Sequence, residues 1–327
     1  ITSFPTQYDI EKAAYWWRRA TQLGHPLATY NYASLLAEGV GVGKNLELAA
    51  KLFEVAADPG GIASAGHNLG MLYIDGEGVT QDLKKAKRWL EWAAGRGLTE
   101  SMCQLGTMYS QEIGVKKDWE KALMYFRNAS HLGDAQALTN IGLCYLYGDG
   151  VPQNEEKAFD CFYKAAAKNN IQACFHLALL KKDGRGCKKD YAVAMDYMER
   201  ATKEEPEAMK ILSLWILEKK PKIGTPAMKK AVKLMEDAAM QFHNPDALYH
   251  FGIWTAYGKH GINEDDLMGK NFLYEAQELG HPRAHVEISK ITAMQEEEVR
   301  IHNEKFDRGE KVFDYDKWNR ISDPDSD

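Results

Sequence analysis

Two groups of residues have types and spacings that could support chemistry. The run from Gly39 to Lys44 is rich in glycine and ends in lysine, as phosphate-binding loops do. His281 and His285 lie four residues apart, a spacing at which one face of a helix can present two imidazoles to zinc. Each group must be weighed against a simpler structural interpretation.

Neither group has the full pattern that its chemistry requires. A phosphate-binding loop needs four residues between its first glycine and Gly-Lys, followed by serine or threonine, but Asn45 follows Lys44. The histidine pair lacks a surrounding glutamate pattern and an evident third ligand, which favours two surface histidines of a helix. Cys174 and Cys187 are also close in sequence, but one opens a predicted helix and the other lies in a turn. We therefore expect no catalytic residue, no metal and no cofactor.

Composition restricts the class of protein. The chain has 327 residues, of which 45% are hydrophobic and 27% charged, so it can bury a continuous core. The formal net charge of −6, with both signs interspersed, argues against a nucleic-acid partner. No apolar run is long enough to insert into a bilayer. Five cysteines form no even framework, which favours free thiols and a soluble intracellular protein, cytoplasmic or mitochondrial, and disfavours the lumen of the endoplasmic reticulum.

The sequence repeats itself with a period of 36 to 38 residues. A small residue recurs in eight places, and an alanine follows each of them seven residues later. Offsets of 0, 3 and 7 fall on one side of a helix, so each repeat is predicted to contain an amphipathic helix. The eight places are Ala13, Ala50, Ala86, Ala122, Ala158, Ala194, Ala231 and Gly269.

A large side chain follows each of these small residues after three positions. We interpret the resulting small–large–small stripe as core packing, in which the large side chain fills the space between repeats. These side chains are Trp16, Phe53, Trp89, Tyr125, Cys161, Tyr197, Leu234 and Phe272.

Another helix precedes each of these amphipathic helices within its repeat. Its glycines Gly70, Gly106 and Gly142 recur every 36 residues and indicate a helix crossing too close for a Cβ atom. A glycine-containing turn joins the two helices, because glycine readily adopts the positive φ that ends a helix. Aspartate or asparagine then provides the predicted N-cap of the second helix. These caps are Asn45, Asp82, Asp118, Asn154, Asp190 and Asp265.

The combined motifs Leu-Gly-x-x-Tyr, Gly-x-Gly-Val and Asp-x-x-Lys-Ala at this period resemble the Sel1-like repeat family, which is related to the tetratricopeptide repeats. The resemblance covers about residues 9–290. It implies an all-α, right-handed α/α superhelical solenoid of about eight repeats of 36–38 residues. The repeat marks are missing around 205–230, where we expect irregular stacking, and Gly269 stands where alanine belongs.

The predicted organisation has three parts: an N-terminal arm (1–8), the solenoid (9–308, with a capping helix from about 282 to 308) and a tail (309–327). The tail alternates aromatic and charged residues, with Phe313, Tyr315 and Trp318 as its aromatic side chains. Three interpretations stay open: a cap that folds back over the last repeat, a docking segment for a partner, or a disordered end. Its exposed aromatic residues would suit an interface within a larger complex.

The resemblance also implies that the first helix of each repeat lines a concave groove. Two residues before the glycine position stands a ladder of neutral polar side chains, which we call the rung residues. Such side chains carry donors and acceptors that can bind the main chain of a peptide, although they can equally bridge neighbouring helices. His67 and Met71 flank the ladder and belong to the same predicted surface. The rung residues are Asn31, Asn68, Gln104, Asn140, His176 and His250.

Repeat proteins of this kind hold other proteins in place, so we expect a non-catalytic scaffold or adaptor, a subunit or assembly factor of a larger complex. The predicted partner is a protein, contributing a peptide or helix to the groove and contacting the tail. The alternative is an enzyme, or a metal- or cofactor-binding protein, that uses the solenoid as a frame.

Overall fold

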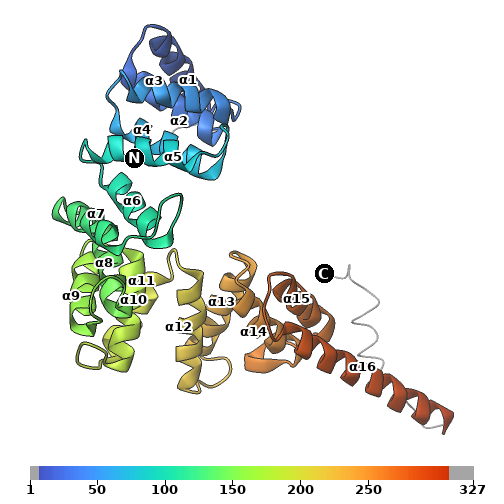
Figure 1. Cartoon of the computed structure of the whole chain (residues 1–327). Coiled ribbons are helices and arrows are strands. Elements are labelled where there is room, and N and C mark those ends of the chain that lie inside the picture. The colour runs from blue at the N-terminus through green and yellow to red at the C-terminus, as the bar shows by residue number, and fades with distance from the viewer. Residues whose placement is uncertain (1–6, 309–327) are drawn as a thin grey trace. The chain divides into compact units, whose positions relative to one another are not determined.

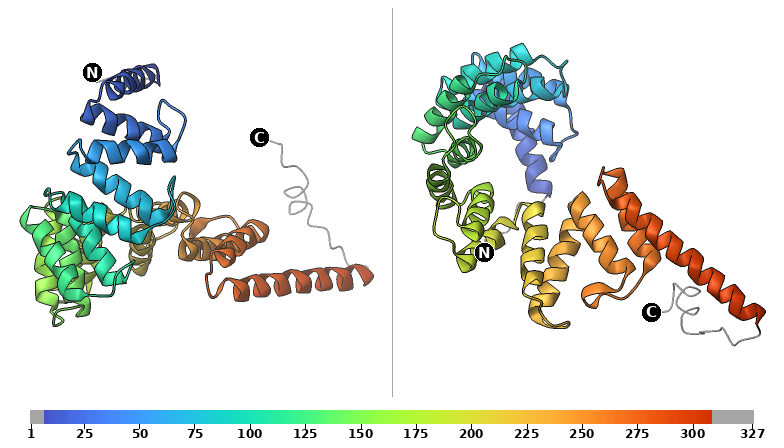
Figure 2. Two further views of the ribbon diagram at one scale, coloured as in Figure 1. Left: turned by 45° about the horizontal axis from the view of Figure 1, so that its top comes forward. Right: turned by 60° about the horizontal axis from the view of Figure 1, so that its bottom comes forward.

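The computed structural model describes residues 7–308, and every regular element within them is a helix (Figure 1). The chain forms two compact units, residues 1–194 and 195–327. Within each unit a helix packs chiefly on the helices directly before and after it, as the two views in Figure 2 show. The predicted all-α solenoid of α/α repeats is therefore confirmed.

The helices alternate between the first and second helix of a repeat. The second helices have odd numbers and the first helices have even numbers, and a short 3-10 turn follows α14. The α-helices of residues 7–308 are α1 (Gln7–Gln22), α2 (Pro26–Glu38), α3 (Leu46–Ala57), α4 (Ala63–Asp75), α5 (Leu83–Ala94), α6 (Thr99–Gln111), α7 (Trp119–His131), α8 (Ala135–Tyr147), α9 (Glu155–Ala166), α10 (Ile171–Asp183), α11 (Tyr191–Ala201), α12 (Pro206–Glu218), α13 (Pro226–Met240), α14 (Pro245–Ala256), α15 (Asp266–Glu278) and α16 (Ala284–Asp307).

The six predicted N-caps all cap second helices. Asn45, for example, accepts a hydrogen bond from the backbone N–H of Leu48 at 2.9 Å, which satisfies a donor that has no partner within α3. Asp190 accepts from Val193 N–H at 3.1 Å in the same way. The period of 36 residues is therefore marked at every second helix after α1 except α13, where Thr225 accepts from Met228 N–H instead.

The inter-helix turns use glycine for two separate reasons. Gly76 ends α4 with a φ of 74°, a conformation that costs an L-residue energy. Gly78, two residues later, also has a positive φ, and a Cβ atom there would collide with the backbone of Leu46 in α3. The turn of one repeat thus lies directly on the second helix of the repeat before it.

The prediction that large side chains at the third position fill the core is confirmed in part, since Trp89, Tyr125 and Cys161 are half-buried against core clusters. Trp16 is 66% exposed, and only Phe53 and Phe272 of the eight are buried. The buried large residue stands one position later, as Leu90, Phe126 and Phe162 do. The alanines eight positions after the first one are buried too, which moves the centre of the stripe toward the fourth position. These alanines are Ala94, Ala166 and Ala239.

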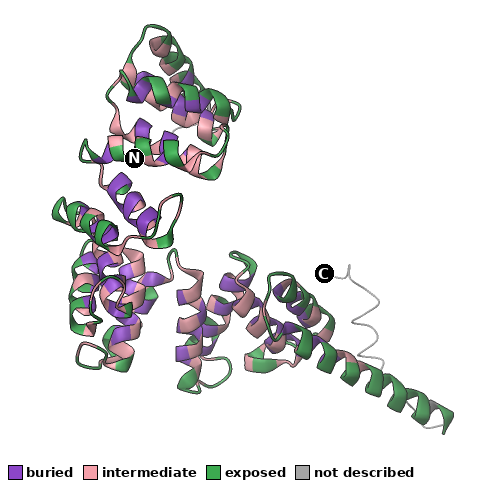
Figure 3. Ribbon diagram, in the orientation of Figure 1, coloured by how far each residue is buried: buried purple, intermediate pink, exposed green. Residues whose placement is uncertain are grey.

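The recurring glycine of the first helix is explained by this buried large residue. A Cβ atom built on Gly142 would lie 2.7 Å from Cε1 of Phe162, and one on Gly70 would lie 2.9 Å from Cγ of Leu90. Both distances are too short for carbon atoms in contact. The two helices of a repeat therefore approach each other through a glycine on one side and a large apolar side chain on the other. Figure 3 shows that buried residues of each helix alternate with exposed ones along the ribbon.

In the second unit, different residues stand where the first and second helices of a repeat cross. In α12 the small residue is Ser213, whose hydroxyl donates a hydrogen bond to the carbonyl of Ala231 at 2.6 Å. In α15 the exceptional Gly269 is required, because its Cβ would lie 2.5 Å from Cβ of Ala256 in α14. The departures from the repeat pattern are therefore local exchanges at the helix crossing.

We predict that Gly142→Ala lowers the free energy of unfolding by about 1–3 kcal/mol, because the added methyl must displace the ring of Phe162. Urea denaturation followed by circular dichroism measures the change. Gly43→Ala is the matched control, since no atom lies within 4 Å of its Cβ position. Phe162→Met should partly rescue Gly142→Ala, as a flexible side chain can yield. Equal stability of Gly142→Ala and the control would contradict the crossing.

Candidate functional site

The rung residues lie on first helices of both units and are all half-buried. Each stands two positions before the residue at the helix crossing, which places it beside the core but in reach of solvent. The flanking residue Met71 is also half-buried. The aromatic tail residues Phe313, Tyr315 and Trp318 lie outside the described residues.

Three of the rung residues keep their hydrogen-bonding groups unused. Within residues 7–308, the amide side chains of Asn31, Asn68 and Gln104 have no hydrogen-bond, ion-pair or ring partner. The described residues also include no fully buried side-chain nitrogen or oxygen without a partner. These three amides are thus open to solvent on α2, α4 and α6, where each offers a donor and an acceptor.

In three successive first helices, the position directly before the rung residue connects neighbouring repeats. The buried hydroxyl of Thr139 in α8 donates to Oδ1 of Asn170, the N-cap of α10, at 3.0 Å. Cys103 in α6 donates through its thiol to Asp134, the N-cap of α8, at 3.6 Å. His67, predicted as a partner contact, lies 3.0 Å from the hydroxyl of Ser101 in the next first helix. These residues, which we call the bridging row, therefore connect neighbouring helices. The sequence left this role open for the rung residues, which stand one position later.

The other rung residues in the first unit also have intramolecular contacts. Asn140 accepts a hydrogen bond from Gln136 at 3.3 Å. His176 stacks on Phe162, with ring centroids 4.9 Å apart. Burial against this ring lowers the pKa of His176 to about 4, since a charged imidazole would lose its hydration there. The rung residues thus lie on first helices, as the sequence predicted. They differ in whether their hydrogen-bonding groups are unused or already engaged within the chain.

The depressed pKa of His176 predicts a loss of stability in acid. The unfolded chain takes up this proton near pH 6.5 and the folded chain near pH 4, so stability falls as the pH decreases between these values. Between pH 7 and 4.5 this histidine should contribute about 2 kcal/mol of that loss. His176→Asn, which restores the amide found in other repeats, should remove this contribution. Urea midpoints of both proteins at the two pH values test it, and identical pH dependence would contradict the assignment.

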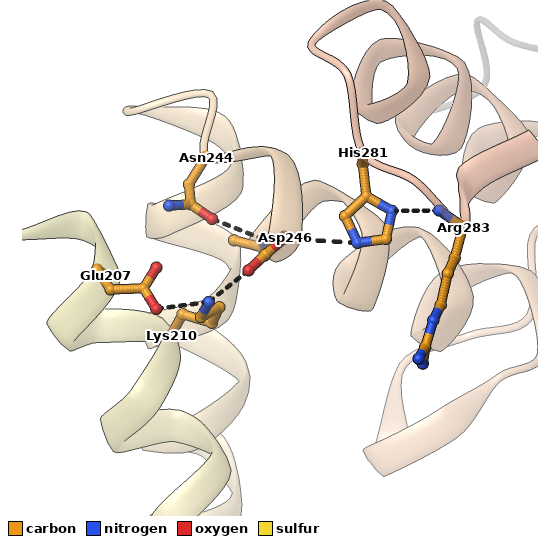
Figure 4. A network of polar contacts seen from close by, with 7 residues as sticks. Glu207, Lys210, Asn244, Asp246, His281 and Arg283 are labelled. Atoms are coloured by element: carbon orange, nitrogen blue, oxygen red, sulfur yellow. Dashed lines mark hydrogen bonds and ion pairs between the residues drawn. The ribbon is translucent and has the colours of Figure 1, made fainter.

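In the second unit, charged side chains occupy the corresponding place (Figure 4). Lys210 of α12 is 9% exposed, and its ammonium group lies 2.6 Å from Oε1 of Glu207 and 2.7 Å from Oδ2 of Asp246 in α14. His281 approaches the other oxygen of Asp246 at 3.5 Å and stacks on Tyr249, with centroids 4.1 Å apart. The network thus links α12, α14 and the turn before α16.

The network has a simple electrostatic origin. Glu207 and Asp246 stand at the second position of their helices, and Lys210 neutralises these two like charges. Burial opposes the charge on Lys210, but hydrogen bonds to Asp246 and Glu207 outweigh it and raise the lysine pKa. Lys210 also lowers the pKa of Asp246. Because the repeat marks are missing around α12, Lys210 escaped the sequence analysis; taking Ser213 as the crossing residue would have placed it in the bridging row.

Lys210→Met should destabilise the protein by about 2 kcal/mol, because it leaves two partly buried carboxylates without their cation. Converting the carboxylates as well, in Glu207→Gln/Lys210→Met/Asp246→Asn, should recover most of this loss. Thermal and urea denaturation of the three proteins measure it. A triple variant no more stable than Lys210→Met would show that the lysine acts by packing alone.

The groups considered first for chemistry do not assemble into a metal or phosphate site. Residues 39–44 form the turn between α2 and α3, and His285 is exposed on α16 while His281 joins the Asp246 network. No group of three or more metal-ligating side chains occurs in residues 7–308. All five cysteines are free thiols, and burial raises the pKa of Cys144 to about 11. Among the described helices, none has the length and apolar character needed to cross a membrane.

Comparison with known proteins agrees with this architecture. A family model described as Sel1 repeat matches six segments: 4–25, 26–60, 63–98, 99–134, 135–170 and 171–205. The chain is similar to a Sel1 repeat protein from Oxalobacter formigenes, with 27% identity and a TM-score of 0.65, over 89% of this chain and 83% of that one.

It is also similar in fold to c5321, a protective antigen of uropathogenic Escherichia coli with the SLR fold, at 23% identity and a TM-score of 0.61. That alignment covers 91% of this chain, which spans only 64% of the length of the antigen. No curated protein sequence matches the chain significantly.

Proposed function

Because the chain belongs to the Sel1 repeat family, we propose that it is a non-catalytic scaffold that binds protein partners through its first helices. Stacked repeats of this kind present extended surfaces that typically mediate protein–protein interactions. The observation that carries the proposal is the set of unpartnered amides of Asn31, Asn68 and Gln104 at one repeated position. They can bind a polypeptide without any change in the helices.

The proposed partner is a protein segment, a peptide or helix, rather than a nucleic acid. Main-chain N–H and C=O groups match side-chain amides in donors and acceptors, whereas a net charge of −6 repels phosphates. Within this proposal the protein serves as an adaptor, or as a subunit or assembly factor of a complex. The tail with Phe313, Tyr315 and Trp318 is proposed as a second contact.

A peptide selected from a random display library on the wild-type protein would test the proposal. We predict that Asn31→Ala/Asn68→Ala/Gln104→Ala weakens its binding about tenfold to a hundredfold, as the loss of two or three hydrogen bonds implies. Fluorescence anisotropy measures the dissociation constants.

The matched control is Asn128→Ala/Gln277→Ala, which removes exposed amides from the second helices α7 and α15. A chain shortened to residues 1–308 measures how much the tail contributes to the affinity for the peptide. Equal weakening by the triple variant and the control, or selection of no peptide at all, would refute a binding face on the first helices.

A further inference from the structure

We propose that amide side chains at the starts of α8 and α10 bind a carboxylate of a partner through two outward-facing NH2 groups. The inference rests on the proposed function only in placing a partner at this face. The four residues concerned are Gln136, Asn140, Asn170 and Gln172, which come from two successive repeats and are half-buried or exposed. The direction of the hydrogen bonds among them decides which groups they show to solvent.

The direction is fixed at Asn170, the N-cap of α10. Its Oδ1 accepts the backbone N–H of Ala173 at 2.8 Å and the hydroxyl of Thr139 at 3.0 Å. A backbone N–H can only donate, so the atom that faces it must be the amide oxygen. The nitrogen of Asn170 therefore points the other way, toward α8.

The orientation of Asn170 fixes that of Gln136, and Gln136 in turn fixes those of Gln172 and Asn140. We call this chain of amide hydrogen bonds the relay. Asn170 Nδ2 donates to Oε1 of Gln136 at 3.0 Å, so the nitrogen of Gln136 must face away from Asn170. That nitrogen donates to Oε1 of Gln172 at 2.8 Å and to Oδ1 of Asn140 at 3.3 Å. Both of its hydrogens are used, and Gln136 has no donor left.

The relay ends in two outward-facing NH2 groups. All four amide oxygens already accept a hydrogen bond, whereas the nitrogens of Asn140 and Gln172 donate to no group within residues 7–308. Both residues are tied to the single nitrogen of Gln136, which holds them next to each other. Two adjacent NH2 groups suit a carboxylate, which accepts hydrogen bonds through both oxygens.

The turns before α8 and α10 carry one residue of each charge that is held by a hydrogen bond. In the turn before α10, Lys168 donates to the carbonyl of Gly133 at 2.6 Å. Before α8, Asp134 is engaged as an N-cap by the N–H of Ala137 at 2.7 Å. These two formal charges cancel, while the amino-terminal ends of α8 and α10 favour negative charge.

N-acetylglycine serves as the probe, since it carries a carboxylate like the C-terminus of a polypeptide, and N-acetylglycinamide is its neutral control. We expect N-acetylglycine to shift the side-chain NH2 resonances of Asn140 and Gln172 in a saturable way in ¹H–¹⁵N spectra. The amide control should leave them unchanged. Equal shifts with both compounds, or no saturable shift with either, would overturn the assignment.

Asn170→Asp should reverse the relay. Aspartate still caps α10, as Asp134 caps α8, but it cannot donate to Gln136. Gln136 then turns its nitrogen toward residue 170, and Asn140 and Gln172 turn their nitrogens inward, so oxygens face the probe. We expect at least tenfold weaker binding of N-acetylglycine.

Asn154→Asp is the matched control, because it makes the same change at the N-cap of α9, outside the relay. It should bind the probe as the wild type does. Gln136→Glu should also abolish binding, and it keeps the cap of α10 intact in case Asn170→Asp fails to fold. Unchanged binding by a folded Asn170→Asp or by Gln136→Glu would refute the relay. Because the probe is a small molecule, this result is independent of the peptide selection.

Discussion

The structure depends on one close approach, the crossing of the two helices within each repeat. A residue without a side chain, or with a very small one, meets a large apolar side chain from the second helix, as Gly142 meets Phe162. Solenoid repeats cannot bury their apolar faces alone, so the geometry of this crossing determines how each repeat presents itself to the next. The N-caps and glycine turns fix where the second helix begins, and the crossing fixes how it packs.

The same crossing determines which residues can take part in binding. The residues two and three positions before the crossing residue lie at the edge of the core, as Asn68 and His67 do before Gly70. Of these, the one nearer the next repeat is used to connect helices, through contacts such as that of Thr139 with Asn170. The other keeps its polar group free only where no neighbour reaches it. The polar groups that stay accessible are therefore those that are not used to join the repeats.

Periodicity predicted much of the fold, because small residues and caps recur at positions where their physical roles are local. An N-cap such as Asn45 needs only its own helix, so its position in the sequence is sufficient. The burial of a large residue depends on the neighbouring helix, so the periodicity identified the face but misplaced its centre by one residue. Lys210 was missed because the crossing residue of α12 is a serine and not a glycine, and because its partner Asp246 comes close only once α12 and α14 are packed together.

The first-helix surface also differs from repeat to repeat in the polar groups that it presents, without a change of secondary structure. In α2, α4 and α6 the amides of Asn31, Asn68 and Gln104 act singly, so each keeps both donor and acceptor. At α8 and α10 the amides bond to one another, and the backbone N–H of Ala173 gives the whole group one polarity. In the second unit the position that bridges helices carries Lys210, which lies between two carboxylates. Since the N-cap of α10 fixes the direction of the amides bonded to it, the polar groups that a repeat presents depend on its cap residue as well as on its surface residues.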